Sequence, residues 1–142
     1  TKIKKALEED RIVPYFQPIY NNKTKKIEKY EALVRLIDED GTVISPFFFL
    51  DIAKRAKLYT KITKIMIEKS FKAFENRCEE LSLNISTQDL VNPDIVKFIE
   101  NKLEEYNMKK RAIFENSEQN TLLNCRGVVI EITETEEVEN YD

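Results

Sequence analysis

The sequence contains no histidine. This absence excludes acid–base catalysis by imidazole, Ser–His and Cys–His nucleophile pairs, and most zinc hydrolase sites. Any catalysis by this chain must therefore use carboxylates, lysine, tyrosine or a metal ion that is bound through oxygen.

Long hydrophobic runs and an excess of basic charge are also absent. No stretch approaches the roughly 18 apolar residues of a membrane span, and no signal peptide opens the chain. The net charge of −3 argues against binding to a nucleic-acid polymer. We therefore expect a cytoplasmic chain that has no membrane segment.

Cysteine is scarce, and its spacing does not indicate a metal site. Cys78 and Cys125 lie far apart in the sequence. Cysteines in the reducing cytoplasm usually stay unpaired. We therefore predict two free thiols.

The composition is that of one globular domain. The 142 residues are enough for a sizeable core, and 42% of them are hydrophobic while 35% are charged. The chain begins with Thr1 rather than methionine. We therefore expect it to be a piece of a longer protein.

The order of sequence patterns predicts an α/β protein with a mainly parallel sheet. We predict helices over residues 2–10, 47–58, 60–80 and 93–106, and strands over residues 12–20, 29–36, 81–86 and 128–134. The first two strands flank a turn at 21–24, so they should pair as an antiparallel hairpin. The segment 107–126 is polar and weakly patterned, and we interpret it as a loop or a partly helical insertion.

The second predicted strand carries charges inside an apolar run. Glu31, Leu33 and Arg35 share one face, because side chains alternate along a strand. Strand interiors normally exclude such charges. The two charged residues are therefore each other's partners, part of a solvated face on an edge strand, or part of a site.

The other three predicted strands each carry a polar residue too, namely Gln17, Asn84 and Glu131. Buried polar groups need partners. Carboxylate and amide oxygens bind Mg²⁺, Mn²⁺ or Ca²⁺, and a nearby arginine and glutamine would suit a phosphate. Spacing alone leaves a metal–phosphate site and a satisfied polar layer equally open.

Taken in order, these motifs resemble the EAL domain family, bacterial phosphodiesterases that hydrolyse cyclic di-GMP. The resemblance covers nearly the whole chain except 107–126, where the family usually has a much shorter connection. The segments that carry it are Tyr15–Ile19, Glu31-Ala32-Leu33 with Arg35, Ser45-Pro46 with Phe49 and Ala53, Leu81–Ser86, and Glu131–Glu134.

The resemblance implies the first half of a (β/α)8 TIM-like barrel with an antiparallel first strand, in a partial domain that spans residues 1–142. It implies Mg²⁺ or Mn²⁺ as cofactor and hydrolysis of cyclic di-GMP to the linear dinucleotide pGpG by metal-activated water. The roles it implies are metal binding by Glu31, Asn84 and Glu131, substrate binding by Gln17, Leu33 and Arg35, and catalysis by Glu31 with Glu134, the latter steadying a loop over the site.

The chain also departs from the family pattern. A complete barrel of this type needs roughly 250 residues, and the family's later Asp-Asp-Phe-Gly run, its downstream lysine and its last glutamate are absent. Lys54 and Lys57 stand where the family more often has an acidic residue and a glycine. We therefore expect an active enzyme in the intact protein but an inactive fragment.

Two alternatives remain beside the enzyme. One is a catalytically inactive EAL-like module that binds cyclic di-GMP or a partner protein, and the other is an unrelated α/β domain with a chance Glu-Ala-Leu run. We further expect a homodimer and, in the longer protein, an attached GGDEF or sensory domain.

Overall fold

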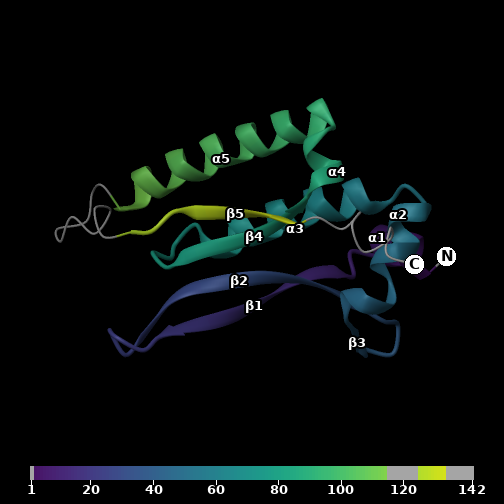
Figure 1. Cartoon of the computed structure of the whole chain (residues 1–142), viewed down its shortest axis with the longest axis horizontal. Helices are drawn as coiled ribbons and strands as arrows, with labels where there is room; N and C mark the ends of the chain where they lie inside the picture. The colour runs from purple at the N-terminus through teal and green to yellow at the C-terminus, as the bar shows by residue number, and fades with distance from the viewer. Residues whose placement is uncertain (1, 115–124, 134–142) are drawn as a thin grey trace.

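The structure, a computed structural model, describes residues 2–114 and 125–133 (Figure 1). Within these ranges no helix is both long enough and apolar enough to cross a membrane. The elements in chain order are α1 (Lys2–Glu8), β1 (Ile12–Asn21), β2 (Lys26–Ile37), β3 (Val43–Ile44), the 3-10 helix η1 (Pro46–Phe48), α2 (Leu50–Arg55), α3 (Tyr59–Phe74), β4 (Glu80–Ser86), α4 (Thr87–Leu90), α5 (Pro93–Phe114) and β5 (Val128–Thr133).

The strands form one sheet in the order β1-β2-β4-β5, and the short β3 pairs with β2. β1 runs antiparallel to β2, whereas β2, β4 and β5 are parallel to one another. The helices that connect the parallel strands cover one face of the sheet, as in a barrel wall. This arrangement confirms the predicted α/β fold, with an antiparallel first strand and part of a barrel.

The main core lies between the sheet and the helices α3 and α5. Leu81, Leu83 and Ile85 of β4 are almost fully buried there. α3 and α5 bury their own apolar stripes against them, including Phe71 of α3 and Ile95 of α5. Because side chains alternate, the polar residues between the β4 apolar residues face away from the helices.

A buried tyrosine links the two long helices of this core. Tyr106 of α5 donates its hydroxyl to the carbonyl oxygen of Phe74 at 3.2 Å and accepts a hydrogen bond from Nζ of Lys110 at 2.6 Å. Burial raises the pKa of Tyr106 to about 12 and lowers the pKa of Lys110. The hydroxyl therefore gives the ammonium of Lys110 a buried acceptor and adds a second donor to the Phe74 carbonyl, which also accepts from the N–H of Arg77.

We expect Tyr106→Phe to lower the free energy of unfolding by about 1–3 kcal/mol, because the substitution removes the acceptor of the buried Lys110 ammonium. Urea denaturation at pH 7 measures the loss, with the exposed Tyr20→Phe as control.

An unfolded tyrosine ionises near pH 10. The contribution of Tyr106 is therefore complete below that pH and is lost as the pH rises through about 12. Equal stability of Tyr106→Phe and wild type would contradict this account.

Two predicted helix ends were wrong. α3 ends at Phe74 rather than near residue 80, because the chain turns there, with the N–H of Arg77 bonded to the Phe74 carbonyl, and enters β4. α5 continues to Phe114 instead of ending near Tyr106, which agrees with the alternative that the segment 107–126 is partly helical. Lys110 sits one turn after Tyr106 and is buried against its ring, so the buried stripe of α5 extends beyond residue 106. Residues 115–124 lie outside the described ranges.

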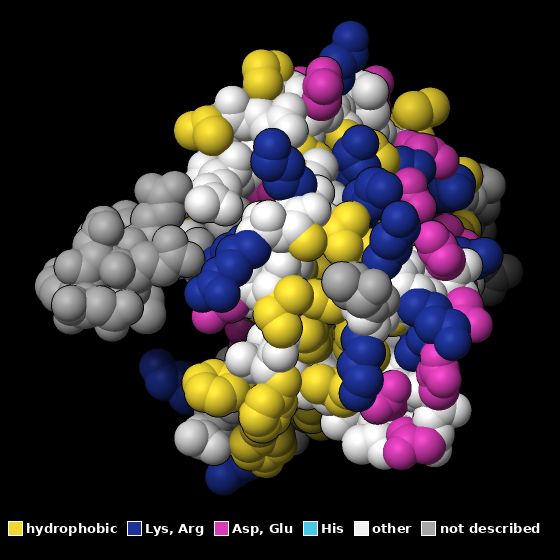
Figure 2. All heavy atoms as spheres, turned by 90° about the vertical axis from the view of Figure 1, so that its right-hand side faces the viewer, with side chains coloured by type: hydrophobic (Ala, Val, Ile, Leu, Met, Phe, Trp, Pro, Cys, Tyr) yellow, Lys and Arg dark blue, Asp and Glu magenta, His cyan; other side chains and the backbone are white. Residues whose placement is uncertain are grey.

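The predicted helix at 47–58 is replaced by η1 and the short α2. Ser45 stands at the start with Pro46 in the first position as predicted, but its side chain makes no capping hydrogen bond. Phe49 is buried, whereas Phe47 and Phe48 are 86% and 68% exposed, which agrees with the expectation that three adjacent phenylalanines cannot all point inward. Figure 2 shows the end of the molecule that carries α2 and β3, with hydrophobic side chains at the surface beside lysine and arginine.

The prediction of free thiols was wrong, because Cys78 and Cys125 form a disulfide. Each cysteine lies shortly before one of the two parallel strands β4 and β5. Parallel pairing brings these two segments side by side, and the N–H of Arg126 donates to the carbonyl oxygen of Cys78 at 2.9 Å. The sequence separation of 47 residues concealed this proximity.

Candidate functional site

The six described residues of the predicted site lie on the sheet face that points away from the helices. Their strand neighbours Phe16, Ala32, Leu83 and Ile130 pack in the helix-facing core, so alternation turns the site residues to the other face. The residues are Gln17 of β1, Glu31, Leu33 and Arg35 of β2, Asn84 of β4 and Glu131 of β5. Glu134 lies outside the described residues.

Glu31 and Asn84 are in direct contact. Nδ2 of Asn84 donates to Oε1 of Glu31 at 3.2 Å, and Gln17 lies directly opposite Glu31 in the β1–β2 register. Rotation of the Asn84 amide would present its oxygen to the same region in place of its nitrogen. A carboxylate and an amide from two strands therefore already meet on this face.

Glu131 is held by two residues that the sequence reasoning did not select. Oε1 of Glu131 accepts a hydrogen bond from Oγ of Ser82 at 2.9 Å and lies 3.6 Å from Nζ of Lys29. Ser82 is fully buried and lies opposite Glu31 in the β2–β4 register. Ser82 shares its strand face with Asn84, and Lys29 shares its face with Glu31, so alternation was the signal that could have found both.

Arg35 does not pair with Glu31. Nη1 of Arg35 donates to the carbonyl oxygen of Val34 at 2.8 Å, and no ion pair joins Arg35 to a carboxylate among the residues that the structure describes. This removes the interpretation that the two charges of β2 are each other's partners. The guanidinium has five N–H donors, so one bond leaves several for an anion.

An apolar cavity of ≈ 270 Å³ adjoins the polar face. It lies beyond Glu31 and Ser82, the last pair of the β2–β4 register, in the space between the sheet and α3. Helix-facing residues such as Ala32, Leu83 and Ile85 line it together with residues of α3, and Leu33, Asn84 and Thr133 line it as well. An apolar hollow beside a group of polar side chains is the usual form of a small-molecule site. Leu33 is therefore placed at the border between the two.

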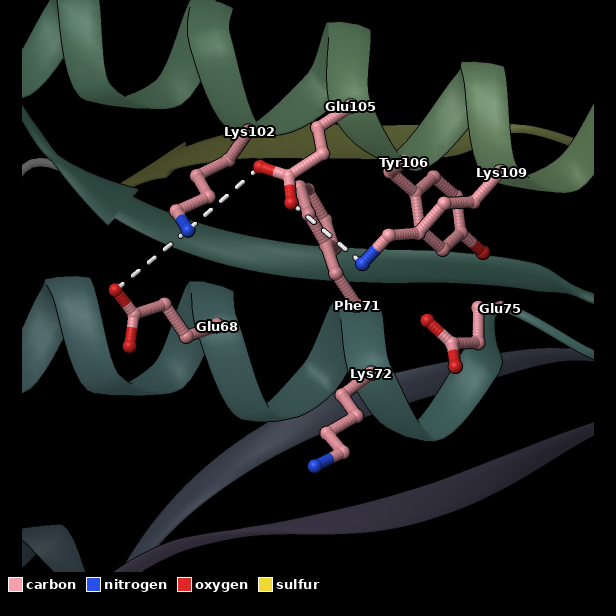
Figure 3. A pocket seen from close by; sticks show the side chains of 8 residues that line it. All are labelled: Glu68, Phe71, Lys72, Glu75, Lys102, Glu105, Tyr106 and Lys109. Atoms are coloured by element: carbon pink, nitrogen blue, oxygen red, sulfur yellow. Dashed lines mark ion pairs between the residues drawn. The ribbon is translucent and has the colours of Figure 1, made fainter.

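A second hollow of ≈ 320 Å³ lies between α3 and α5, on the helical side of the sheet (Figure 3). Ion pairs of lysine and glutamate line its rim. Nζ of Lys102 lies 3.8 Å from Oε1 of Glu68, and Nζ of Lys109 lies 3.5 Å from Oε1 of Glu105. None of the predicted site residues lines it. This hollow is therefore separate from the candidate site.

We call the sheet face that points away from the helices the inner face. The oxygen atoms on this face fit a hard divalent cation. Glu31 and Glu131 supply carboxylates and Asn84 supplies an amide, which are the oxygen ligands that Mg²⁺ and Mn²⁺ prefer. Within residues 2–114 and 125–133, no three acidic or cysteine side chains gather closely enough to hold a metal ion by themselves. A metal at this face would therefore depend on the amide of Asn84 as well as on the carboxylates.

The fold and the site together define a class, a partial α/β barrel with an antiparallel first strand and acidic and amide side chains on its inner face. Comparison with known proteins identifies the family. The model of the EAL domain matches residues 1–141, and the chain belongs to this family.

Two curated relatives show how the domain occurs in longer proteins. The chain is 30% identical to the cyclic di-GMP phosphodiesterase PdeB of Shewanella oneidensis over 147 aligned positions, which cover 98% of this chain and 15% of that protein. It is 27% identical to the signaling protein YkoW of Bacillus subtilis, over 93% of this chain and 18% of that protein. The chain thus spans less than a fifth of either relative.

Solved structures show the same fold. The EAL domain of FimX from Pseudomonas aeruginosa, bound to c-di-GMP, aligns with a TM-score of 0.67 and 21% identity, over 92% of this chain and 60% of that one. The EAL enzyme Bd1971, in its cAMP- and cyclic-di-GMP-bound form, aligns with a TM-score of 0.70 and 24% identity, over 98% of this chain and 37% of that one. These likenesses support the fold assignment.

Proposed function

We propose that this domain, within its intact protein, hydrolyses cyclic di-GMP to pGpG. The observation that carries the proposal is the contact between Glu31 and Asn84, with Glu131 on the same sheet face. Membership of the EAL family and a relative named as a cyclic di-GMP phosphodiesterase support this choice of substrate.

In this proposal Glu31, Asn84 and Glu131 hold Mg²⁺ or Mn²⁺ through their oxygens. When bound, the metal activates water for attack on the phosphodiester. Arg35 holds a phosphate by charge-assisted hydrogen bonds, while Gln17 and Leu33 position the dinucleotide. Glu134 acts beside Glu31 as the second catalytic glutamate, and its role is to steady a loop over the site.

A non-catalytic module that binds cyclic di-GMP is the second candidate. The observation that favours it is the ion pair between Lys29 and Glu131, which places a fixed positive charge on a proposed metal ligand. The same Arg35 and Gln17 would serve substrate binding in both cases. The two candidates therefore differ in cleavage and not in recognition.

The wider context is also proposed. We place the protein in the cytoplasm, as a homodimer, with a GGDEF or sensory domain attached to the EAL domain. Chain 1–142 alone should self-associate through the outer strands β1 and β5, whose outer edges pair with no strand among the described residues, and should show no hydrolysis. Light scattering and a phosphodiesterase assay on the purified chain test both statements.

The test of the function is incubation of the intact protein with cyclic di-GMP and either Mg²⁺ or Mn²⁺, followed by chromatography. Metal-dependent formation of pGpG is the expected result. Binding without cleavage would select the second candidate. Absence of both binding and cleavage would overturn the proposal.

A further inference from the structure

Lys29 brings a positive charge into the proposed metal site. Its ammonium lies 3.6 Å from Oε1 of Glu131 and 3.5 Å from Oε2 of Glu80. We infer that Lys29 is an internal cation that competes with a divalent ion for Glu131, so that this face binds the metal ion weakly. The inference rests on the proposed metal site and assigns a positioning role to a residue outside its ligand set.

The strand geometry fixes the direction of Lys29. The β1–β2 register shifts between Ile19 and Tyr20. Tyr20 pairs with Ile27, and on the other side of the shift Ile19 pairs with Lys29. Lys29 precedes Glu31 by two residues, and in the β2–β4 register it lies opposite Glu80, so all three share the inner face. The neighbouring Glu28 instead contacts Asn21 and Arg126.

Lys29 and a divalent ion would compete for the carboxylate of Glu131. Glu31, Glu80 and Glu131 contribute three negative charges, and Lys29 and Arg35 contribute two positive charges, but among the described residues it is Lys29 that contacts Glu131. The side chain of Lys29 is only 30% exposed, so solvent screens its charge less than at an open surface. A divalent ion that approaches Glu131 must therefore displace the ammonium or bind beside a like charge.

Ser82 also restrains the carboxylate of Glu131. Its Oε1 atom accepts the hydrogen bond of the buried Ser82 in addition to the contact with Lys29. The contact between Glu31 and Asn84 involves neither of these residues. A metal ion held by Glu31, Asn84 and Glu131 must thus displace Lys29 from Glu131, whereas the contact between Glu31 and Asn84 does not involve Lys29.

The experiment is a titration of the intact protein with Mn²⁺ in the absence of dinucleotide. The electron paramagnetic resonance signal of free Mn²⁺ measures how much of the ion remains unbound. Native mass spectrometry counts the bound ions. For Lys29→Met we expect about tenfold tighter Mn²⁺ binding, because a like charge within 4–6 Å changes an ionic equilibrium by about tenfold or more. Lys29→Arg, which keeps the charge, should behave as wild type, and Lys26→Met, on the same strand but exposed, should change the affinity less than twofold.

Mn²⁺ affinity of Lys29→Met within twofold of wild type would overturn the inference, as would an equal gain in Lys26→Met or the absence of Mn²⁺ binding in all variants. Lys29→Gln replaces Lys29→Met if circular dichroism shows that the latter is unfolded. Binding of cyclic di-GMP in EDTA, measured on the same samples, tests substrate recognition separately. The proposed function and the role of Lys29 can therefore fail independently.

Discussion

Replacement of Glu31 by alanine is expected to lower kcat for cyclic di-GMP cleavage by the intact protein by about 10³-fold or more. The substitution removes a carboxylate that we propose as a metal ligand. Metal ions contribute several kcal/mol to the stabilisation of such transition states, and each 1.36 kcal/mol is about tenfold in rate. Initial rates of pGpG formation in saturating Mg²⁺ or Mn²⁺ measure the effect.

Glu28→Ala is the matched control for this experiment. Glu28 lies on the same strand, but its carboxylate contacts Asn21 and Arg126 instead of Asn84. We expect Glu28→Ala to keep the wild-type rate, and we expect both variants to keep the fold. Normal hydrolysis by Glu31→Ala would refute the proposed mechanism.

Replacement of Arg35 by alanine is expected to weaken substrate binding more than turnover. A hydrogen bond to a charged group is worth about 1.5–3 kcal/mol, which corresponds to a rise of about 10- to 150-fold in KM. The change in kcat should be smaller, because Arg35 is proposed to hold phosphate and not metal. Steady-state kinetics with cyclic di-GMP separate the two constants.

Two further variants sharpen the Arg35 experiment. Arg35→Lys keeps the charge but loses the planar pair of donors, so we expect partial recovery of KM. Arg55→Ala, on the exposed surface of α2, should leave both constants unchanged. An unchanged KM in Arg35→Ala would remove this residue from the substrate site.

The sheet could be predicted from the sequence because alternation and turn position are local properties. The pattern of Glu31, Leu33 and Arg35 against Ala32 and Leu36 gave the two faces of β2, and the buried positions of Ala32 and Leu36 confirm them. The short turn before β2 likewise implied the antiparallel hairpin with β1. Both features depend on residues that are close together in the chain.

Alternation places Ser82 and Lys29 on the face of the site, but their contacts with Glu131 could not be predicted, because contacts depend on the register between strands that are distant in sequence. Ser82 contacts Glu131 only because β4 and β5 pair with Asn84 opposite Glu131. The disulfide between Cys78 and Cys125 has the same origin. The helix α4 was also missed, although Ser86 and Asp89 form its capping box.

Buried polar groups were the second source of error. Asp89 is buried, accepts a hydrogen bond from Oγ1 of Thr63 at 2.9 Å, and has its pKa raised by burial. Lys110 is buried beside Tyr106. Residues of these types are usually exposed, so a prediction based on polarity ended α5 too early and missed α4.

The most direct test of the central claim is a crystal structure of the protein with Mn²⁺, in which anomalous scattering locates the ion. The account predicts an anomalous peak on the inner face of the sheet, within coordination distance of Glu31 and the amide oxygen of Asn84. A Mn²⁺ ion bound only elsewhere, with the contact between Glu31 and Asn84 unchanged, would contradict the account.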